Sequence, residues 1–274
     1  SLTLADVVNS ATVTNIESVT GGTADDTITL TSGNDTVTVS GVDTLDSLAG
    51  TDTVTLSDGN TTQITVTNTE TLVGGTGNDN VTFADVISSA NSIDMGAGTD
   101  TVNLASSGSN VATISNAETI VVAVSGGSDD VITLGTTITS GSVDLQQGND
   151  TLVLADGSNT LTVVNTESVT GGTGDDTITL ASSGTNIVTV TDVETVSGSG
   201  GLDTVTVLGS TGARVATGNL VDTITGGSGN DSLSGGGGAD EGDGGAGDDI
   251  FFSNLNVSIV AGDSIEGGLG IDTL

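Results

Sequence analysis

Residues 165–180 read NTESVTGGTGDDTITL, and residues 15–30 read NIESVTGGTADDTITL. A related copy, NTETLVGGTGNDNVTF, occupies residues 68–83. Repetition of this kind indicates a fold built from stacked copies of one small unit. The aspartate that ends each glycine-containing turn recurs with a favoured spacing of about 27 residues, which is three steps of nine.

The residues that follow each turn aspartate alternate between polar and apolar side chains, as in Asp176-Thr-Ile-Thr-Leu180. Apolar side chains at every second residue predict a strand with one buried face. These strands recur at a period, and Gly, Asn and Asp turns join them without a helical pattern between. The sequence therefore predicts an all-β fold, a parallel β-solenoid with coils of about 27 residues.

From residue 226 the glycine–acid turns follow one another at steps of nine. They read GGSGNDSLS at 226–234, GGGGADEGD at 235–243 and GGAGDDIFF at 244–252. We expect residues 1–225 to form the solenoid with broad coils. We expect residues 226–274 to form a tighter, metal-rich section continuous with it.

The charge of the chain restricts its partners. There are 36 acidic residues and one basic residue, Arg214, so the formal net charge is -35. No basic surface is available for a phosphate backbone or an anionic lipid, which argues against nucleic-acid binding and membrane insertion. The chain has no Cys for disulfides, and its self-repulsion requires positive charge from outside. The predicted partner is a metal cation.

One nonapeptide carries the metal chemistry: G-G-x-G-x-D-x-U-x, in which U is apolar. It is present at 74–82, 171–179, 226–234 and 244–252, and as far as the sequence runs at 267–274. At 21–29 Ala24 replaces the third glycine, and at 235–243 Gly242 replaces the apolar residue. These residues resemble the RTX (repeats-in-toxin) calcium-binding family, closely over 226–274 and more loosely elsewhere. The resemblance implies a β-roll-like terminal section, several Ca²⁺ ions shared between consecutive turns, and type I secretion to an extracellular or bacterial cell-surface location.

The turn composition suits calcium. Glycines allow the backbone to turn carbonyl oxygens inward, and the aspartate adds a carboxylate. Calcium takes roughly six to eight oxygens of both kinds, so two stacked turns can supply what one cannot. In broken turns, such as those that end at Asp52, Asp100 and Asp203, a plain turn and a metal site are equally favoured. Carried over residue by residue, the resemblance assigns the metal sites to Asp26, Asp79, Asp176, Gly226, Gly229, Asn230, Asp231, Gly235, Asp240, Gly244, Asp248, Asp249 and Asp272.

The N-x-E segments suggest a second pattern. Asn15, Asn68, Asn116 and Asn165 are candidates for an amide ladder, in which each side chain hydrogen-bonds to the next along one corner of the solenoid. The glutamates of these segments are expected to form a solvated row rather than a second metal site.

The two ends of the sequence match each other. Residues 268–274 joined to residues 1–10 read GLGIDTL-SLTLADVVNS, which parallels the internal segment that begins QQGNDTLVLADGSN at residue 146. The expected partner is therefore the chain itself, as a head-to-tail homopolymer or as tandem repeats. The leading hypothesis is a calcium-stabilised extracellular structural protein: a filament, sheath, surface layer or adhesin stalk.

Two alternatives stay open. Outward threonine pairs such as Thr27/Thr29 and Thr204/Thr206 are typical of an ice-binding β-solenoid, although threonine is also a common strand residue. The chain also fits a passive RTX export or folding module of a larger toxin or enzyme. No enzyme is expected within these residues, because His, Lys, Tyr and Trp are absent and there is a single Arg.

Overall fold

The computed structural model describes residues 1–57, 62–123, 127–181, 184–252 and 262–274, and every regular element in these residues is a β-strand. The chain divides into two compact units. Unit 1 comprises Ser1–Thr136 and Gln146–Gly148, and unit 2 comprises Thr137–Leu145 and Asn149–Leu274. Across the described ranges there is no helix that is long and apolar enough to cross a membrane.

Unit 1 consists of two parallel sheets, one of odd-numbered and one of even-numbered strands. The odd strands are β1 (Leu2–Thr3), β3 (Ser18–Thr20), β5 (Thr36–Ser40), β7 (Thr53–Leu56), β9 (Thr71–Gly75), β11 (Ser92–Gly96), β13 (Val111–Ser115) and β15 (Val131–Leu134). The even strands are β2 (Asn9–Thr12), β4 (Asp26–Thr29), β6 (Thr44–Asp46), β8 (Gln63–Thr67), β10 (Asn80–Phe83), β12 (Thr101–Leu104) and β14 (Thr119–Val122).

Unit 2 has the same two-sheet construction. Its odd strands are β17 (Thr151–Val153), β19 (Ser168–Thr170), β21 (Thr185–Thr191), β23 (Leu202–Leu208), β25 (Thr223–Thr225), β27 (Glu241–Asp243) and β29 (Ser264–Glu266). Its even strands are β16 (Ser142–Asp144), β18 (Thr160–Val164), β20 (Thr177–Leu180), β22 (Thr195–Ser197), β24 (Arg214–Asn219), β26 (Ser232–Gly237) and β28 (Ile250–Phe251).

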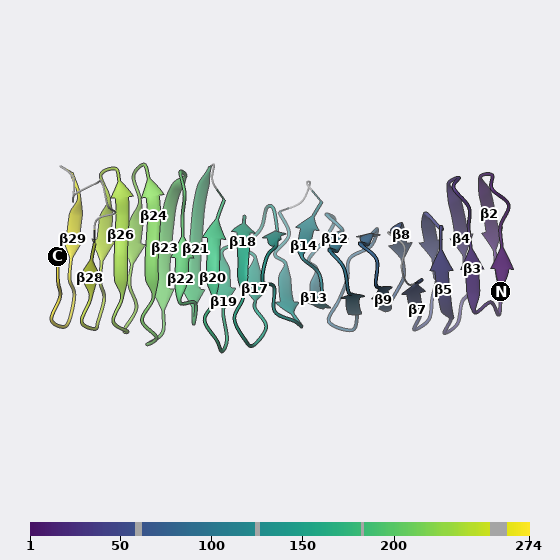
Figure 1. Ribbon diagram of the computed structural model, residues 1–274, viewed down its shortest axis with the longest axis horizontal. Coiled ribbons are helices and arrows are strands. Elements are labelled where there is room, and N and C mark those ends of the chain that lie inside the picture. The colour runs from purple at the N-terminus through teal and green to yellow at the C-terminus, as the bar shows by residue number, and fades with distance from the viewer. Residues whose placement is uncertain (58–61, 124–126, 182–183, 253–261) are drawn as a thin grey trace. The chain divides into compact units, whose positions relative to one another are not determined.

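Within each unit, every strand pairs in parallel with the next strand of its own sheet, so the chain winds alternately through the two sheets (Figure 1). One odd strand, one even strand and their two turns complete a coil. This arrangement confirms the predicted all-β, parallel β-solenoid.

The coils are shorter than the sequence period suggested. Residues that bond between neighbouring coils are 17 to 23 positions apart, as for Asp26 with Asp43 and Asp240 with Asp263. The prediction of coils of about 27 residues was therefore wrong, because a nine-residue step covers one strand and one turn, which is half a coil. A 27-residue step covers three half-coils and returns on the opposite sheet: Asp26 begins β4 of the even sheet, whereas Asp52 directly precedes β7 of the odd sheet. The division at residue 226 also rested on glycine content and stays a prediction.

The core consists of the inward side chains of the two facing sheets. Alternate residues of each strand are buried, as in β20, where the buried residues Ile178 and Leu180 alternate with Thr177 and Thr179. Because the pairing is in register, each buried side chain packs between equivalent side chains of the neighbouring coils. One such row in the even sheet of unit 2 contains Leu161, Ile178, Val196, Val215, Leu233 and Phe251.

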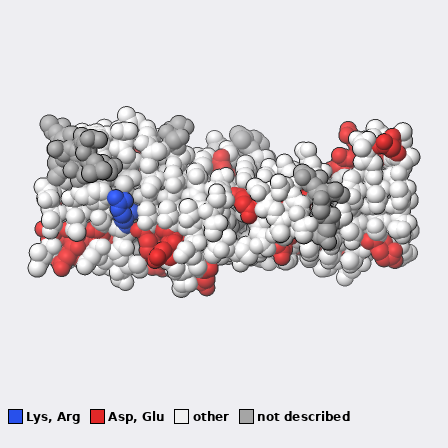
Figure 2. All heavy atoms as spheres, viewed as in Figure 1, with Lys and Arg blue, Asp and Glu red and all other residues white. Residues whose placement is uncertain are grey.

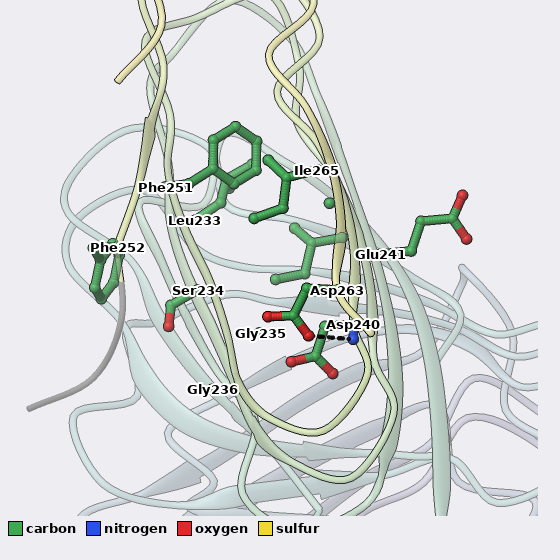
Figure 3. Close-up of a pocket in the computed structure, with 12 residues that line it drawn as sticks. Leu233, Ser234, Gly235, Gly236, Asp240, Glu241, Phe251, Phe252, Asp263 and Ile265 are labelled. Atoms are coloured by element: carbon green, nitrogen blue, oxygen red, sulfur yellow. Dashed lines mark hydrogen bonds between the residues drawn. The ribbon is translucent and has the colours of Figure 1, made fainter. Parts of the chain in front are cut away.

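A gap in the odd sheet of unit 2 is filled from the other side. Gly242 lies between Ile224 and Ile265 in its row and contributes no side chain. A Cβ atom on Gly242 would be only 2.9 Å from Cε1 of Phe251, so the phenylalanine ring occupies the space that the glycine leaves. A cavity of about 40 Å³ remains beside this ring and Leu233 (Figure 3). The glycine at the apolar position of the nonapeptide is thus compensated by a large residue on the opposite sheet.

Truncation of a core residue should test this packing. Ile178→Ala removes a fully buried side chain and should lower the free energy of unfolding by about 2–5 kcal/mol, measured by chemical denaturation in saturating calcium. Thr179→Ala, on the exposed face of the same strand, should change it by less than about 0.5 kcal/mol. Equal effects of the two substitutions would contradict the assignment of faces.

Candidate metal centre

The glycine turns lie on two different edges of the solenoid. At one edge the chain passes from an odd-numbered to an even-numbered strand, and we call this the first edge. At the other edge, which we call the second edge, it passes from an even-numbered to an odd-numbered strand. The turns at 21–26, 74–79, 171–176, 226–231 and 244–249 are on the first edge, and the turn at 235–240 is on the second. Asp240 is therefore not brought together with Asp231 and Asp249, although it lies only nine residues from each of them in the sequence.

A ladder of carboxylates joins the coils on the first edge. The aspartate of each turn begins or directly precedes a strand, and its backbone N–H donates to a carboxylate oxygen of the next coil. In unit 1 the Asp79 N–H donates to Asp100 Oδ1 at 2.7 Å. In unit 2 the Asp231 N–H donates to Asp249 Oδ1 at 2.8 Å, and the Asp249 N–H donates to Asp272 Oδ1 at 3.0 Å.

The glutamates of the N-x-E segments belong to the same kind of ladder. Glu118 Oε2 accepts the Asp100 N–H at 2.7 Å, and Glu194 Oε2 accepts the Asp176 N–H at 2.7 Å. On the second edge Glu70 Oε2 accepts the Asp52 N–H at 2.8 Å. These three glutamates are half-exposed, so they keep contact with solvent as expected, but each also accepts a backbone N–H, which the sequence did not predict. The N-x-E turn is shorter than the glycine turn, and the longer glutamate side chain spans the difference.

The asparagines of these segments do not stack on one another. Asn68 and Asn165 have positive φ values of 55° and 48°, which Asn tolerates better than most residues. Their side-chain amides donate to aspartates of the preceding coil, Asn68 Nδ2 to Asp46 Oδ1 at 2.9 Å and Asn165 Nδ2 to Asp144 Oδ1 at 2.8 Å. The predicted amide ladder was wrong, because these asparagines close tight turns in coils that are not adjacent.

The first glycine of each motif forms a cradle of oxygens. A Cβ atom on Gly171 would lie 2.6 Å from Asp176 Oδ2 and in contact with the carbonyl oxygen of Asp192 in the next coil. A Cβ atom on Gly226 would lie 2.7 Å from Asp231 Oδ2 and in contact with the carbonyl oxygen of Gly244. A carboxylate oxygen and a carbonyl oxygen from successive coils therefore converge where a side chain would otherwise be.

Several of these carboxylate oxygens lack a partner. Oδ2 of Asp176 and Oδ2 of Asp249 are buried and accept no hydrogen bond, whereas Oδ2 of Asp231 accepts the Gly227 N–H at 2.8 Å. A buried anionic oxygen without a partner is unfavourable. Calcium satisfies such an oxygen and accepts carbonyl oxygens beside it, so these turns fit the ion. No three acidic side chains within the described residues form a metal-binding group, so backbone carbonyls would have to complete the coordination.

The other predicted site residues have varied places. Asp79 is buried. A Cβ atom on Gly74, the first glycine of the same motif, would contact the carbonyl oxygen of Met95 in the next coil. Asn230 Oδ1 accepts the Asp248 N–H at 2.9 Å, and Asp248 Oδ1 accepts the Ile271 N–H at 2.9 Å. These two side chains are exposed and form an outer ladder.

The remaining motif residues lie at other points of the turns. Asp26 is buried, and its Oδ2 accepts the Gly22 N–H at 2.9 Å. A Cβ on Gly244 would lie 2.5 Å from Asp249 Oδ2, and one on Gly235 would contact the Asp240 carboxylate. A Cβ on Gly229 would be 2.6 Å from the Gly212 nitrogen, so this glycine permits close stacking of two turns. The assignment of all these residues as calcium ligands stays a prediction.

The residue five positions before the aspartate separates two kinds of turn. It is glycine in the cradles above, but it is Leu30 before Asp35 and Met95 before Asp100, and both of these side chains are buried in the core. Sequence reasoning left Asp203 undecided between a plain turn and a metal site, because its turn GSGGLD breaks the nonapeptide spacing. Gly198 at this position is the signal that separates it from the turns of Asp35 and Asp100.

Burial shapes the electrostatics of the ladder. Burial is the main cause that raises the pKa of Asp100, to about 6, and the negative charges of Asp79 and Glu118 raise it further. Burial also raises the pKa of Asp249, with the carboxylates of its neighbours adding to the effect. By contrast, the Gly22 N–H holds the pKa of Asp26 below its usual value.

Positive charge is scarce around the ladder. Arg214 lies over the Phe252 ring, 4.8 Å from its centroid. Between described residues the one ion pair found joins the Ser1 amino group to Glu17 at 3.9 Å, and both are exposed. The acidic side chains gather in patches (Figure 2), so an external cation is needed to neutralise them.

These turns and their stacking define a class of protein, the parallel β-solenoid assembled from glycine–aspartate repeats. The family model of the RTX calcium-binding nonapeptide repeat matches residues 14–41, 20–54, 39–62, 65–82, 165–182 and 217–251. These segments therefore match RTX repeats, and the nonapeptide repeats of this family bind calcium. A comparison with characterised proteins found no match.

The raised pKa of Asp100 predicts a pH dependence for the calcium-free chain. A carboxyl group whose pKa is higher in the folded than in the unfolded state favours folding when it is protonated. Its contribution is full below the ordinary value of 3.8 and is lost as the pH rises through about 6. Urea denaturation of metal-free protein should therefore give a higher midpoint at pH 4.5 than at pH 7. Asp100→Asn should reduce this difference, and a midpoint that rises with pH would contradict the prediction.

Two adjacent aspartates provide a direct test of the cradle. Asp176 is buried with a free Oδ2, whereas Asp175 is exposed on the outside of the same turn. Asp176→Asn keeps Oδ1 as an acceptor for Asn159 and should abolish one calcium site in isothermal titration calorimetry. Asp175→Asn removes the same charge and should leave the number of bound ions unchanged. Loss of a site in both variants, or in neither, would refute the cradle as the ligand set.

Proposed function

We propose that this chain is a calcium-stabilised extracellular structural protein that associates end to end with copies of itself. RTX repeat proteins are generally secreted by type I systems, which suggests an extracellular location. Calcium is abundant there, and its binding to the folded state alone would stabilise that state. A net charge of -35 would oppose folding where calcium is scarce.

The observation that carries the proposal is an uncovered core row in unit 2. Thr273 bridges to Ile250 of β28, which places Leu274 beside Phe251 in the row that also contains Leu233 and Val215. Leu233 and Phe251 are buried, but Leu274 is 76% exposed. A further coil stacked on this strand would bury it, as every other member of the row is buried.

The sequence at the two ends is compatible with such a coil. Residues 271–274 followed by residues 1–3 read IDTL-SLT, which has the alternation of β23, LDTVTVL at 202–208. In β23 the Asp and two Val residues are buried and the Thr residues are partly exposed. A second copy of the chain, in tandem or as a separate subunit, therefore fits the uncovered row. A filament, sheath, surface layer or adhesin stalk could be built in this way.

The outward threonines favour a structural role over an ice-binding one. Thr36 and Thr38 of β5 stand in register with Thr53 and Thr55 of β7. In the next two strands of this sheet, the residues in register with Thr55 are Val73 and then Asp94. The paired threonine surface in this part of unit 1 is therefore interrupted after two strands. An export or folding module of a larger protein is the remaining alternative, and such a module would not assemble.

Self-association can be tested with the 274-residue chain in millimolar calcium. Electron microscopy and sedimentation should show end-to-end assemblies that dissociate when calcium is chelated. Leu274→Asp places a charge at the uncovered row and should abolish assembly while calcium binding persists. Ile187→Asp, a matched change at a residue that is 61% exposed within β21, should assemble normally.

Monodisperse, unassociated particles of the unmodified chain in calcium would overturn the proposal. Assembly that is equally sensitive to both substitutions would show that general charge repulsion, rather than the core row, governs association.

A further inference from the structure

The second edge of unit 2 contains a stacked pair of turns that the nonapeptide does not describe. One turn ends at Asp203, between β22 and β23, and the other ends at Asp222, between β24 and β25. The Asp203 N–H donates to Asp222 Oδ1 at 2.8 Å, which is the ladder bond seen on the first edge. The turn at 198–203 lies outside all residues matched by the RTX family model.

Two buried oxygens in the first of these turns have no partner. Asp203 is 1% exposed, and its Oδ1 is held by the Asn186 side-chain amide at 2.6 Å. Its Oδ2 accepts no hydrogen bond, and neither does the buried Oγ of Ser199. The carboxylate is thus fixed in orientation by Asn186 while its second oxygen remains free to bind a ligand.

The free oxygen points into a cradle like those of the motif turns. A Cβ atom on Gly198 would contact both Asp203 Oδ2 and the carbonyl oxygen of Thr217 in the next coil. A Cβ atom on Gly218 would lie 2.6 Å from the carbonyl oxygen of Ser199. Carboxylate and carbonyl oxygens of two successive coils therefore surround one position that no side chain fills.

The charge at this position is negative and unneutralised. Asp203 and Asp222 are both buried, and Arg214, the one cation among the side chains of the chain, lies over the Phe252 ring. Two stacked buried carboxylates are unfavourable unless a cation or a proton joins them. An oxygen-only set of carboxylate and carbonyl groups suits Ca²⁺.

We propose that the turns 198–203 and 217–222 together hold a Ca²⁺ ion, with Asp203 Oδ2 and the Thr217 carbonyl oxygen as ligands and the Ser199 hydroxyl and Asp222 beside them. The inference rests on the proposed function only in that the chain binds calcium. It extends calcium binding to a turn with a broken nonapeptide, on the edge opposite to most motif turns.

Native mass spectrometry of the 274-residue chain, with calcium as the only probe, counts the ions directly. Asp203→Asn keeps Oδ1 as the acceptor for Asn186 and should bind one ion fewer than the unmodified chain. Asp35→Asn is the matched control: its Oδ2 is also buried and without a hydrogen bond, but Leu30 occupies the position of the cradle glycine. This variant should bind the full number of ions.

An unchanged ion count in Asp203→Asn would overturn the inference. An unmodified chain that binds no calcium would overturn the proposed function as well, so the two failures are distinguishable. If Asp203→Asn does not fold, crystals of the unmodified chain grown in calcium decide the question by anomalous diffraction. A peak between Gly198 and Thr217 supports the site, and peaks at Asp176 and Asp231 without one there reject it.

Discussion

The solenoid depends on one repeated interaction, the hydrogen bond from a strand-leading backbone N–H to a carboxylate of the next coil. Such bonds to a charged acceptor are shorter and stronger than those between neutral groups. Because each bond joins residues at the head of two paired strands, it fixes the register of the pair as well as the stacking. A slip by one residue would expose the apolar row and leave the carboxylate without its donor.

The ladder also explains the two turn types. A long glycine turn brings an aspartate to the strand head, and a three-residue N-x-E turn brings a glutamate whose extra methylene group reaches the same donor. Asn at the first position of the short turn accepts a positive φ and ties the turn to the coil below. The choice between Asp and Glu at the end of a turn therefore depends on how far that turn lies from the backbone N–H that its carboxylate must reach.

The sequence was sufficient to predict the strands but not how they close into coils. The alternation around Ile178 and Leu180 predicted which face of the strand is buried, and both side chains are buried in the structure. The period was misleading because each half-coil carries the same strand-and-turn pattern, so copies on opposite sheets look equivalent in one dimension. The role of Glu118 was hidden for a related reason: its donor, the Asp100 N–H, is 18 residues away. Asp203 was left undecided between a plain turn and a metal site because the number of glycines was weighed more heavily than the one glycine that faces the carboxylate.

The ladder leaves one carboxylate oxygen per aspartate, and its surroundings decide what can bind there. Where Gly171 or Gly226 precedes the aspartate, a carbonyl oxygen of the next coil reaches the same space, and a cation can join two coils. Where Met95 or Leu30 stands at that position, the side chain enters the core instead and no glycine cradle faces the carboxylate. In a repeat fold each coil contacts only its neighbours, so stability is close to a sum of interface contributions. We therefore expect interfaces of the first kind to gain stability from calcium, and those of the second kind to depend on apolar contact and the ladder hydrogen bond, so that any calcium dependence of this solenoid is a local property of particular turns.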